Sequence, residues 1–309
     1  MMKKILTLCT LVSTLCASNH GSMAGSFLRT GISARSIAMG GGFTAEMDHS
    51  FAAFHNPAWA GFLQDQHVGS SYTNMTLDRR LAATSFATPL PPTGGLGIAW
   101  INAGVTDIQG RYSTGEKSTM MQTGENAVVF TFAQRIMPWI SIGANVKILR
   151  YDLPVSRGDE LTGTGIGFDI GILIKSGSYQ TLGIMVQDLS SGYQWNTNDV
   201  FSEGPTYKDE FPTIYRIGSR YLKNGLSIVG DLGVITDHET FADVLPRAGI
   251  EYGFLEQYFF RTGFGNNRIG FGGGYRYGLF NNQDSWIDYT FSLDLASQTA
   301  HTISYAIRF

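Results

Sequence analysis

The sequence predicts an all-β protein, a transmembrane antiparallel β-barrel of about 14 strands. From His67 to the end of the chain, short segments follow one another in which apolar and polar residues alternate. Their mean length of about 11 residues suits a tilted strand that crosses a bilayer. Only 15% of the residues are charged, against about 25% in soluble domains. This composition fits strands that turn every second residue toward lipid.

Turn-forming Gly, Pro, Asn and Asp residues bound the segments. The alternation is clearest at 163–175 and 285–295, where Ile, Leu and aromatic residues occupy one face and Gly, Asp, Ser or Thr the other. The predicted strands are 67–77, 80–88, 95–103, 126–135, 139–151, 163–175, 179–189, 212–222, 226–236, 245–253, 256–264, 268–278, 285–295 and 299–309.

The last segment predicts the closing strand of the barrel. Its apolar face consists of Ile303, Tyr305, Ile307 and Phe309. A terminal strand of this kind resembles the closing strand of bacterial outer-membrane barrels, which they present to the barrel-assembly machinery. We therefore interpret these four residues as an assembly signal.

The connections support the same topology. In a barrel whose chain starts in the periplasm, the links after even-numbered strands are short and the others can be long. We expect short links at 136–138, 176–178, 223–225 and 254–255, with 280–284 slightly longer, and long polar links at 104–125, 152–162, 190–211 and 237–244.

Charged residues lie mostly opposite the aromatic faces of the segments. A Lys or Arg that faces lipid at mid-membrane costs about 2–4 kcal/mol, so we expect these residues to face the lumen and pair there. Glycines on the same faces would leave space inside. A soluble two-sheet sandwich is the alternative, and it would need more polar surface than this sequence offers. The charged residues are Lys147, Asp169, Arg216, Arg220, Asp231, Arg247, Arg261, Arg276, Asp288 and Asp294.

Residues 1–18 are typical of a secretory signal peptide, because two lysines precede an apolar run of 13 residues, Ile5 to Ala17. Cleavage could fall as late as residue 24. A lipoprotein signal at Cys16 is the alternative, although Leu15 stands where that signal has a small residue. Without Lys3 and Lys4 the 22 basic residues become 20, against 25 acidic ones, a net charge of −5. Nothing in this balance indicates a nucleic-acid partner.

Residues 25–66 show no strand alternation and read as a compact, irregular segment packed against a larger structure. The run from Gly31 to Ala45 and the later Asn56-Pro57-Ala58 resemble the PorV/PorQ (UPF0164) family, with its pattern G-x-x-A-R-x-x-x-M-G-G-x-F-x-A. That family is similar to FadL-type barrels, which carry an N-terminal hatch inside the lumen. The resemblance implies a hatch at 25–66, a barrel at 67–309 and a location in the bacterial outer membrane.

The hatch motif implied by this resemblance consists of Met39, Gly40, Gly41, Phe43, Asp48, Asn56, Pro57 and Ala58. Two departures weaken the functional comparison. Met47 and His49 replace the alanine and acidic residues more usual beside Asp48, and the chain is shorter than PorV proteins that serve type IX secretion.

The sequence contains no motif that predicts catalysis or a cofactor. No H-E-x-x-H pair, no G-x-S-x-G elbow and no phosphate-binding loop occurs. We therefore expect no enzyme, cofactor or metal site, and assign His49, His55, His67, His238 and His301 to loops or the hatch. Four aromatic residues could instead line a pocket for a hydrophobic ligand where hatch meets wall, or simply pack the hatch: Phe51, Phe54, Trp59 and Phe62.

Three functions stay open at this point, and the family resemblance favours the first as the main interpretation. The first is a PorV/PorQ-type barrel that binds or shuttles secreted or surface proteins as part of a type IX-like secretion pathway. The second is a FadL-like channel for hydrophobic small molecules such as fatty acids, with a wall break through which the substrate leaves sideways. The third is a structural barrel without transport. All three imply outer-membrane lipid as a partner.

Overall fold

The computed structural model describes residues 23–47, 50–155, 160–200, 204–237, 240–278, 283–294 and 298–309 of the 309-residue chain. The predicted signal peptide lies outside these residues, as do Asp48 and His49. Within the described residues, no helix has the length and apolar character needed to cross a membrane.

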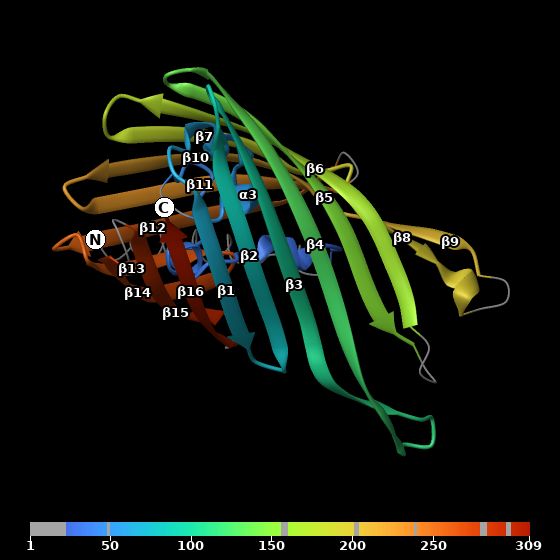
Figure 1. The fold of residues 1–309 in the computed structure, drawn as a ribbon. Coiled ribbons are helices and arrows are strands. Elements are labelled where there is room, and N and C mark those ends of the chain that lie inside the picture. Colours follow the sequence, from blue (N-terminus) through green and yellow to red (C-terminus); the bar gives the residue numbers. More distant parts are fainter. Residues whose placement is uncertain are drawn as a thin grey trace, which may run out of the picture.

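The described residues contain one antiparallel sheet of 16 strands, 14 of which close into a barrel (Figure 1). The ring closes between β1 and β16, which pair from His67↔Arg308 to Met75↔Ala300. Each of the 14 predicted segments overlaps one strand of the ring, so the predicted barrel is confirmed. These strands are β1 (His67–Met75), β2 (Arg79–Leu90), β3 (Gly94–Arg111), β4 (Lys117–Met137), β5 (Ile140–Pro154), β6 (Glu160–Ser176), β7 (Gln180–Leu189), β10 (Thr213–Lys223), β11 (Leu226–Asp237), β12 (Thr240–Phe254), β13 (Tyr258–Gly265), β14 (Arg268–Gly278), β15 (Asp284–Asp294) and β16 (Thr299–Arg308).

Side chains alternate between the outside and the lumen along each strand. On β5, Ile142 and Ile148 point outward and are 42% and 53% exposed, whereas Asn145 and Lys147 point inward and are buried. Because lipid cannot hydrogen-bond, apolar side chains belong outside and charges inside. The predicted inward charges are indeed buried at Asp169, Arg216, Arg220, Asp231, Arg247, Arg261 and Asp288.

The predicted long links are wrong in most places, because the strands continue through them. The expected link at 104–125 shrinks to 112–116, since β3 and β4 extend past the membrane as a long hairpin. Register shifts at Val105/Ile108 and Gln109/Arg111 break the period-two alternation there. The sequence pattern therefore did not indicate strands in this stretch. Likewise only 155–159 separate β5 from β6, and only 238–239 separate β11 from β12.

The expected link at 190–211 is also wrong, because it contains a second hairpin. Strands β8 (Gly192–Asn196) and β9 (Thr206–Glu210) pair with each other, and η4 (Thr197–Asp199) follows β8. Strand β8 joins the edge of β6 at Gly163↔Trp195 and Thr164↔Gln194. The hairpin lies beyond β6, on the right in Figure 1.

The opposite end of the barrel has the tight turns that were predicted. Residues 138–139, 177–179, 224–225 and 255–257 make these links, which confirms their shortness. Gly177 and Asn224 adopt left-handed φ angles of 72° and 51°, as tight hairpins require. Short turns are typical of the periplasmic end, so the long β3–β4 hairpin lies at the extracellular end.

Residues 23–63, here called the N-terminal segment apart from the undescribed positions 48 and 49, form four short helices: η2 (Ser26–Arg29), α2 (Ala34–Ala38), α3 (Ala52–His55) and η3 (Pro57–Phe62). Ser33 and Ser36 form a capping box at the start of α2. Helix α2 contacts β13–β16, and η3 contacts β2–β6. The segment therefore joins opposite sides of the ring (Figure 1).

The lipid-facing side of β6 gives a direct test of the barrel. Ile170 lies in the middle of the outward apolar row of β6 and is 46% exposed. We expect Ile170→Lys to lower the free energy of unfolding in lipid vesicles by about 2–4 kcal/mol, and Thr164→Lys, near the edge of that row, by about 0–1 kcal/mol. Equilibrium unfolding by denaturant measures both. Equal effects at the two depths would contradict the membrane placement.

Candidate functional site

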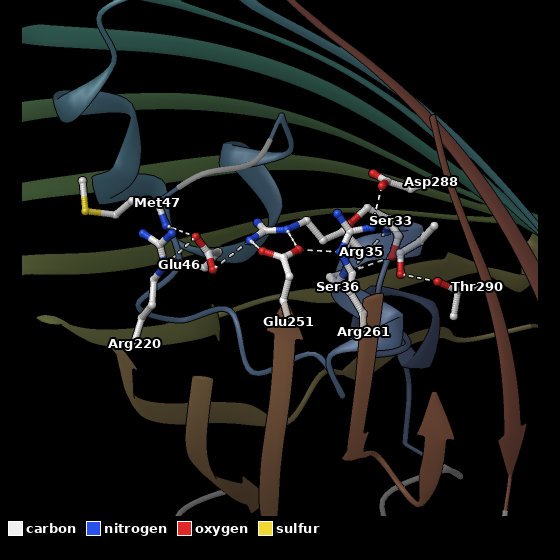
Figure 2. Close-up of polar contacts among 11 residues, drawn as sticks. Ser33, Arg35, Ser36, Glu46, Met47, Arg220, Glu251, Arg261, Asp288 and Thr290 are labelled. Carbon is white, nitrogen blue, oxygen red and sulfur yellow. Dashed lines mark hydrogen bonds and ion pairs between the residues drawn. The ribbon is translucent and has the colours of Figure 1, made fainter. Parts of the chain in front are cut away.

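Four alternating charges link the N-terminal segment to the barrel wall (Figure 2). Arg35 of α2 donates from Nε and Nη2 to the two carboxylate oxygens of Glu251, each at 2.7 Å. Arg261 donates to the same carboxylate and, from Nη1, to Asp288. These side chains are at most 10% exposed. Burial makes their mutual pairing obligatory, since removing one partner of a buried pair costs about 3–5 kcal/mol.

Glu46 extends this arrangement to a fourth wall strand, β10, through Arg220. Its carboxylate lies 3.4 Å from Arg35 Nη2 and 3.1 Å from Arg220 Nε, and it accepts a hydrogen bond from the backbone N–H of Met47. With Glu46 the row contains three cations and three anions. The wall and the segment thus neutralise each other's charges across the lumen.

A second polar link lies beside the first. Thr44 donates from its backbone N and its hydroxyl to Asp231 Oδ2, at 3.1 and 2.7 Å. Arg216 Nη2 donates to the same oxygen at 2.7 Å and to the carbonyl of Gly41 at 3.1 Å. Residues 41–44 are therefore fixed to β10 and β11.

Glycines of the wall make room for the backbone of the segment. A Cβ at Gly249 or Gly263 would lie 2.4 Å from the backbone of Met39, and one at Gly270 would lie 2.5 Å from the carbonyl of Ile37. Gly40 itself has a φ of 67° and fits against the backbone of β13. Gly270 thus leaves space inside as predicted, and residues 37–40 fill that space.

Of the remaining described motif residues, Gly41 and Phe43 follow directly on this contact, whereas Ala58 lies on the other side of the ring. Met39, Phe43 and Ala58 are fully buried, and Gly41 has a left-handed φ of 73°. Asp48 lies outside the described residues, so its role in the motif remains a prediction.

The Asn56-Pro57-Ala58 turn rests on the other side of the ring. Asn56 donates to the carbonyls of Thr44 at 2.7 Å and Ile172 at 3.3 Å, and its Oδ1 accepts from Ala58 N at 3.1 Å. A Cβ at Gly171 would lie 2.0 Å from this Oδ1. The motif residues of both blocks therefore contact wall glycines.

The extracellular half of the lumen holds a large apolar group of buried side chains, here called the luminal apolar cluster. The wall contributes Leu81, Ala83, Ala99, Ile101, Ala103, Ala127, Val129 and Leu149, the N-terminal segment contributes Phe27, Leu28, Ile32 and Phe51, and the region of the β8–β9 hairpin contributes Tyr193, Trp195 and Phe211.

Aromatic rings from the hairpin form one side of this cluster. Ring centroids of Tyr193 lie 5.0 Å from Phe211 and 5.8 Å from Trp195, and Tyr151 lies 5.3 Å from Trp195. The Tyr193 hydroxyl donates to Glu125 at 3.0 Å. Sequence reasoning missed these residues because it assigned 190–211 to a loop. The alternation of Tyr193 and Trp195 with polar neighbours was the available signal.

The four predicted ligand-lining aromatic residues do not come together. Phe51 belongs to the luminal apolar cluster and Phe54 packs against it. Trp59 and Phe62 lie in a separate cluster with Ala58, Ala60, Leu63, Ala87, Ala133 and Leu173. Only the first pair belongs to or borders the cluster that contains the hairpin aromatic rings.

The described histidines occupy separate places. His55 is buried between Phe43 and Phe54, His67 lies 5.2 Å from the Trp59 ring, and His301 packs against Tyr289. Among the described residues, no three His, Cys, Asp or Glu side chains are grouped so as to hold a metal ion. His49 and His238 lie outside this part of the chain.

The predicted assembly signal lies on β16 and at the C-terminus. Ile303 and Phe309 are exposed at 58% and 47%, and Tyr305 and Ile307 are half-buried. Their role in assembly is a prediction still.

Solved structures share this architecture. The Ralstonia pickettii toluene transporter TbuX matches with a TM-score of 0.63 and 14% identity over 90% of this chain and 98% of that one. The CymD monoaromatic hydrocarbon channel matches with 0.65 and 14% over 95% and 99%, and a Pseudomonas aeruginosa FadL homologue with 0.62 and 11% over 90% and 98%. No protein-family model and no curated sequence matches.

The chain has a FadL-type outer-membrane barrel fold.

In this FadL-type fold the wall is interrupted at the extracellular end of β7. The β6–β7 register shifts between Ile170↔Val186 and Phe168↔Leu189, and Asp188 and Ser190 adopt left-handed φ angles of 60° and 51°. Beyond Leu189, residues 190–192 cross the luminal side of β6 until β8 joins its edge. A Cβ at Gly165 would lie 1.7 Å from the carbonyl of Gly192. We call this interruption the wall step.

Buried charges hold the wall step in place. Lys147 of β5 donates to Asp169 at 2.6 Å and also to Asp188. Asp169 in turn accepts from the backbone N of Asp188 at 2.8 Å and from Asn145 at 2.9 Å. Lys147 thereby ties the end of β7 to its neighbours where ladder hydrogen bonds stop.

A larger side chain at Gly263 tests the close contact between the barrel wall and the backbone of the N-terminal segment. We expect Gly263→Val to displace Met39–Gly40, because its Cβ would overlap their backbone, and so to speed protease cleavage within residues 34–47 at least tenfold. Gly124→Val is the matched control on a wall strand, since nothing lies within 4 Å of a Cβ there. Equal cleavage in both variants would contradict the close packing.

His55 predicts a pH dependence. Burial, followed by the nearby Arg216, Arg247 and Arg35, holds the His55 pKa well below its usual 6.5. The unfolded chain therefore binds a proton below about pH 6.5 that the folded chain excludes, and the stability falls as pH falls, by up to about 1.4 kcal/mol per pH unit.

Unfolding free energies measured between pH 8 and pH 5 should show this slope in the wild type and less of it in His55→Gln. His301→Gln, at an exposed position, should keep it. An unchanged slope in His55→Gln would exclude His55 as its cause.

Proposed function

We propose that this protein is an outer-membrane channel for hydrophobic small molecules. The luminal apolar cluster is the observation that supports this most strongly. A channel for water-soluble solutes has a polar lumen, whereas here the extracellular half of the lumen presents aliphatic and aromatic side chains from wall, segment and hairpin. Such a surface suits a ligand without charge.

The names of the similar structures point the same way. They describe a toluene transporter and a monoaromatic hydrocarbon channel. The identities are low and establish the fold alone, so the substrate class is a proposal that rests on the apolar lumen of this chain.

Residues 25–66 act, in this proposal, as a hatch. The row of buried charges from Arg220 to Asp288 lies where an apolar solute would have to pass toward the periplasm. An apolar solute offers those charges no hydrogen bonds, so separating them is costly. The wall step offers another exit, sideways through the wall, because only the crossing at 190–192 closes it.

The secretion hypothesis rests on the motif at 31–58 alone, and the comparisons favour the channel. The motif residues described here contact the wall of their own barrel. A structural barrel without transport is the remaining alternative, and it is separated from the channel by measuring uptake.

The test is uptake of labelled toluene and oleate by cells that lack their own FadL-type proteins and express this chain. We expect uptake above that of empty-vector cells. Leu149→Lys should reduce it at least tenfold, because Leu149 is buried in the luminal apolar cluster and an apolar ligand there would strip water from the new charge without replacing its hydrogen bonds. Gln122→Lys, on an exposed part of β4, adds the same charge and should leave uptake unchanged.

Folding of each variant is checked by its heat-dependent migration in gels. Wild-type uptake equal to that of empty-vector cells would reject the channel. Co-purification of secreted proteins in that case would favour the secretion hypothesis, and the absence of both would favour the structural barrel.

A further inference from the structure

The β8–β9 hairpin joins the wall beside β6 (Figure 1), and a row of four polar residues crosses the paired strands there. Arg150 pairs with Thr164, and Thr164 pairs with Gln194. Gln194 pairs with Lys208. Directly paired residues share one face of a sheet, and all four side chains are exposed. The row spans three strand spacings, so Arg150 and Lys208 stand about 14 Å apart along the sheet.

This row marks the extracellular edge of the lipid-facing surface. The next row toward the periplasm contains the pair Ile148↔Ile166, with 53% and 57% of each side chain exposed. On the extracellular side, the next outward pair is Asp152↔Thr162. Apolar residues thus give way to polar ones within one step, which is where lipid head groups lie.

A groove with a volume of about 590 Å³ opens at the same place. Its lining includes the four polar residues of the row, with Ile148 and Ile166 beneath them and Tyr193 at its inner side. The groove therefore has an apolar part at the level of acyl chains and a polar part at the level of head groups.

Each of the two cations forms an exposed ion pair within the described part of the chain. Arg150 lies 2.9 Å from Asp152, with 59% and 28% of these side chains exposed, and Lys208 lies 2.6 Å from Glu210, with 63% and 39% exposed. Exposed pairs contribute about 0–1 kcal/mol. A phosphate, which forms charge-assisted hydrogen bonds with guanidinium and ammonium groups, can therefore replace these carboxylates.

We propose that this groove binds an anionic lipid of the outer leaflet, a glycolipid with two phosphates. Cations at both ends of the row match phosphates at both ends of the head group, and Thr164 and Gln194 match the hydroxyl groups between them. The acyl chains then lie on Ile148 and Ile166. The groove borders the wall step, since Gly165, Ser190 and Gly192 also line it, but lipid binding by its outward row does not depend on the proposed channel function.

The test uses the full-length folded protein in detergent, with native mass spectrometry to count retained lipids. The probes are diphosphorylated lipid A, phosphatidylcholine and inorganic phosphate. We expect lipid A to be retained at least tenfold better than phosphatidylcholine, with a loss of about tenfold in the double variant Arg150→Gln/Lys208→Gln. Added salt should weaken retention, since exposed charges are screened.

The matched control is Arg111→Gln/Lys117→Gln, which removes two exposed cations that pair at the tip of the β3–β4 hairpin. It should keep lipid A. Equal retention of the two lipids by the wild type, or equal losses in both double variants, would overturn the proposal. Displacement of lipid A by millimolar inorganic phosphate would also overturn it, because the site would then be one for small anions.

Discussion

The structure depends on one constraint, that lipid accepts no charge and no unpaired polar group. Closing 14 strands into a ring satisfies the backbone, but it turns every charged side chain of the membrane-spanning rows inward. Those charges then need partners within the lumen. Wall strands supply some of them, as Arg261 with Asp288, while Arg35 and Glu46 of the N-terminal segment supply the others. The segment therefore does more than fill the barrel: its Arg35 and Glu46 neutralise buried charges of the wall.

The same constraint divides the lumen into two regions with different chemistry. Beside β10–β15 the wall presents charges and glycines, and the segment meets them with its backbone, Arg35 and Glu46. Beside β2–β5 the wall presents aliphatic side chains, and the segment meets them with Phe27, Leu28 and Phe51. An apolar molecule that enters from outside finds favourable contacts in the second region and a desolvation penalty in the first.

Strand positions were predictable from sequence because lipid and lumen impose a period of two, as at Ile166 to Ile174 of β6. The pattern failed where that constraint ends. Bulges near Val105 displace the register of β3 beyond the membrane, and β8 and β9 are only five residues long, too short to show a clear alternation. Glycines such as Gly270 indicated space inside the barrel, but which residues fill it depends on contacts between distant parts of the chain. For the same reason the sequence could not show that Phe51 and Phe54 lie in a different cluster from Trp59 and Phe62, since all four fall within twelve residues.

The motif at 31–58 explains how the N-terminal segment packs against the barrel wall, but it does not indicate a function. Met39 and Gly40 fit against wall glycines, Arg35 pairs with Glu251, and Asn56 hydrogen-bonds to carbonyls of the segment and the wall. Each contact serves to seat the segment in a barrel, and a barrel that transports hydrocarbons needs that seating as much as one that serves secretion. The proposed channel function rests instead on surfaces the motif does not include, the aliphatic face of β2–β5 and the aromatic side of the β8–β9 hairpin. A family resemblance confined to the motif can therefore predict the architecture correctly without indicating the substrate.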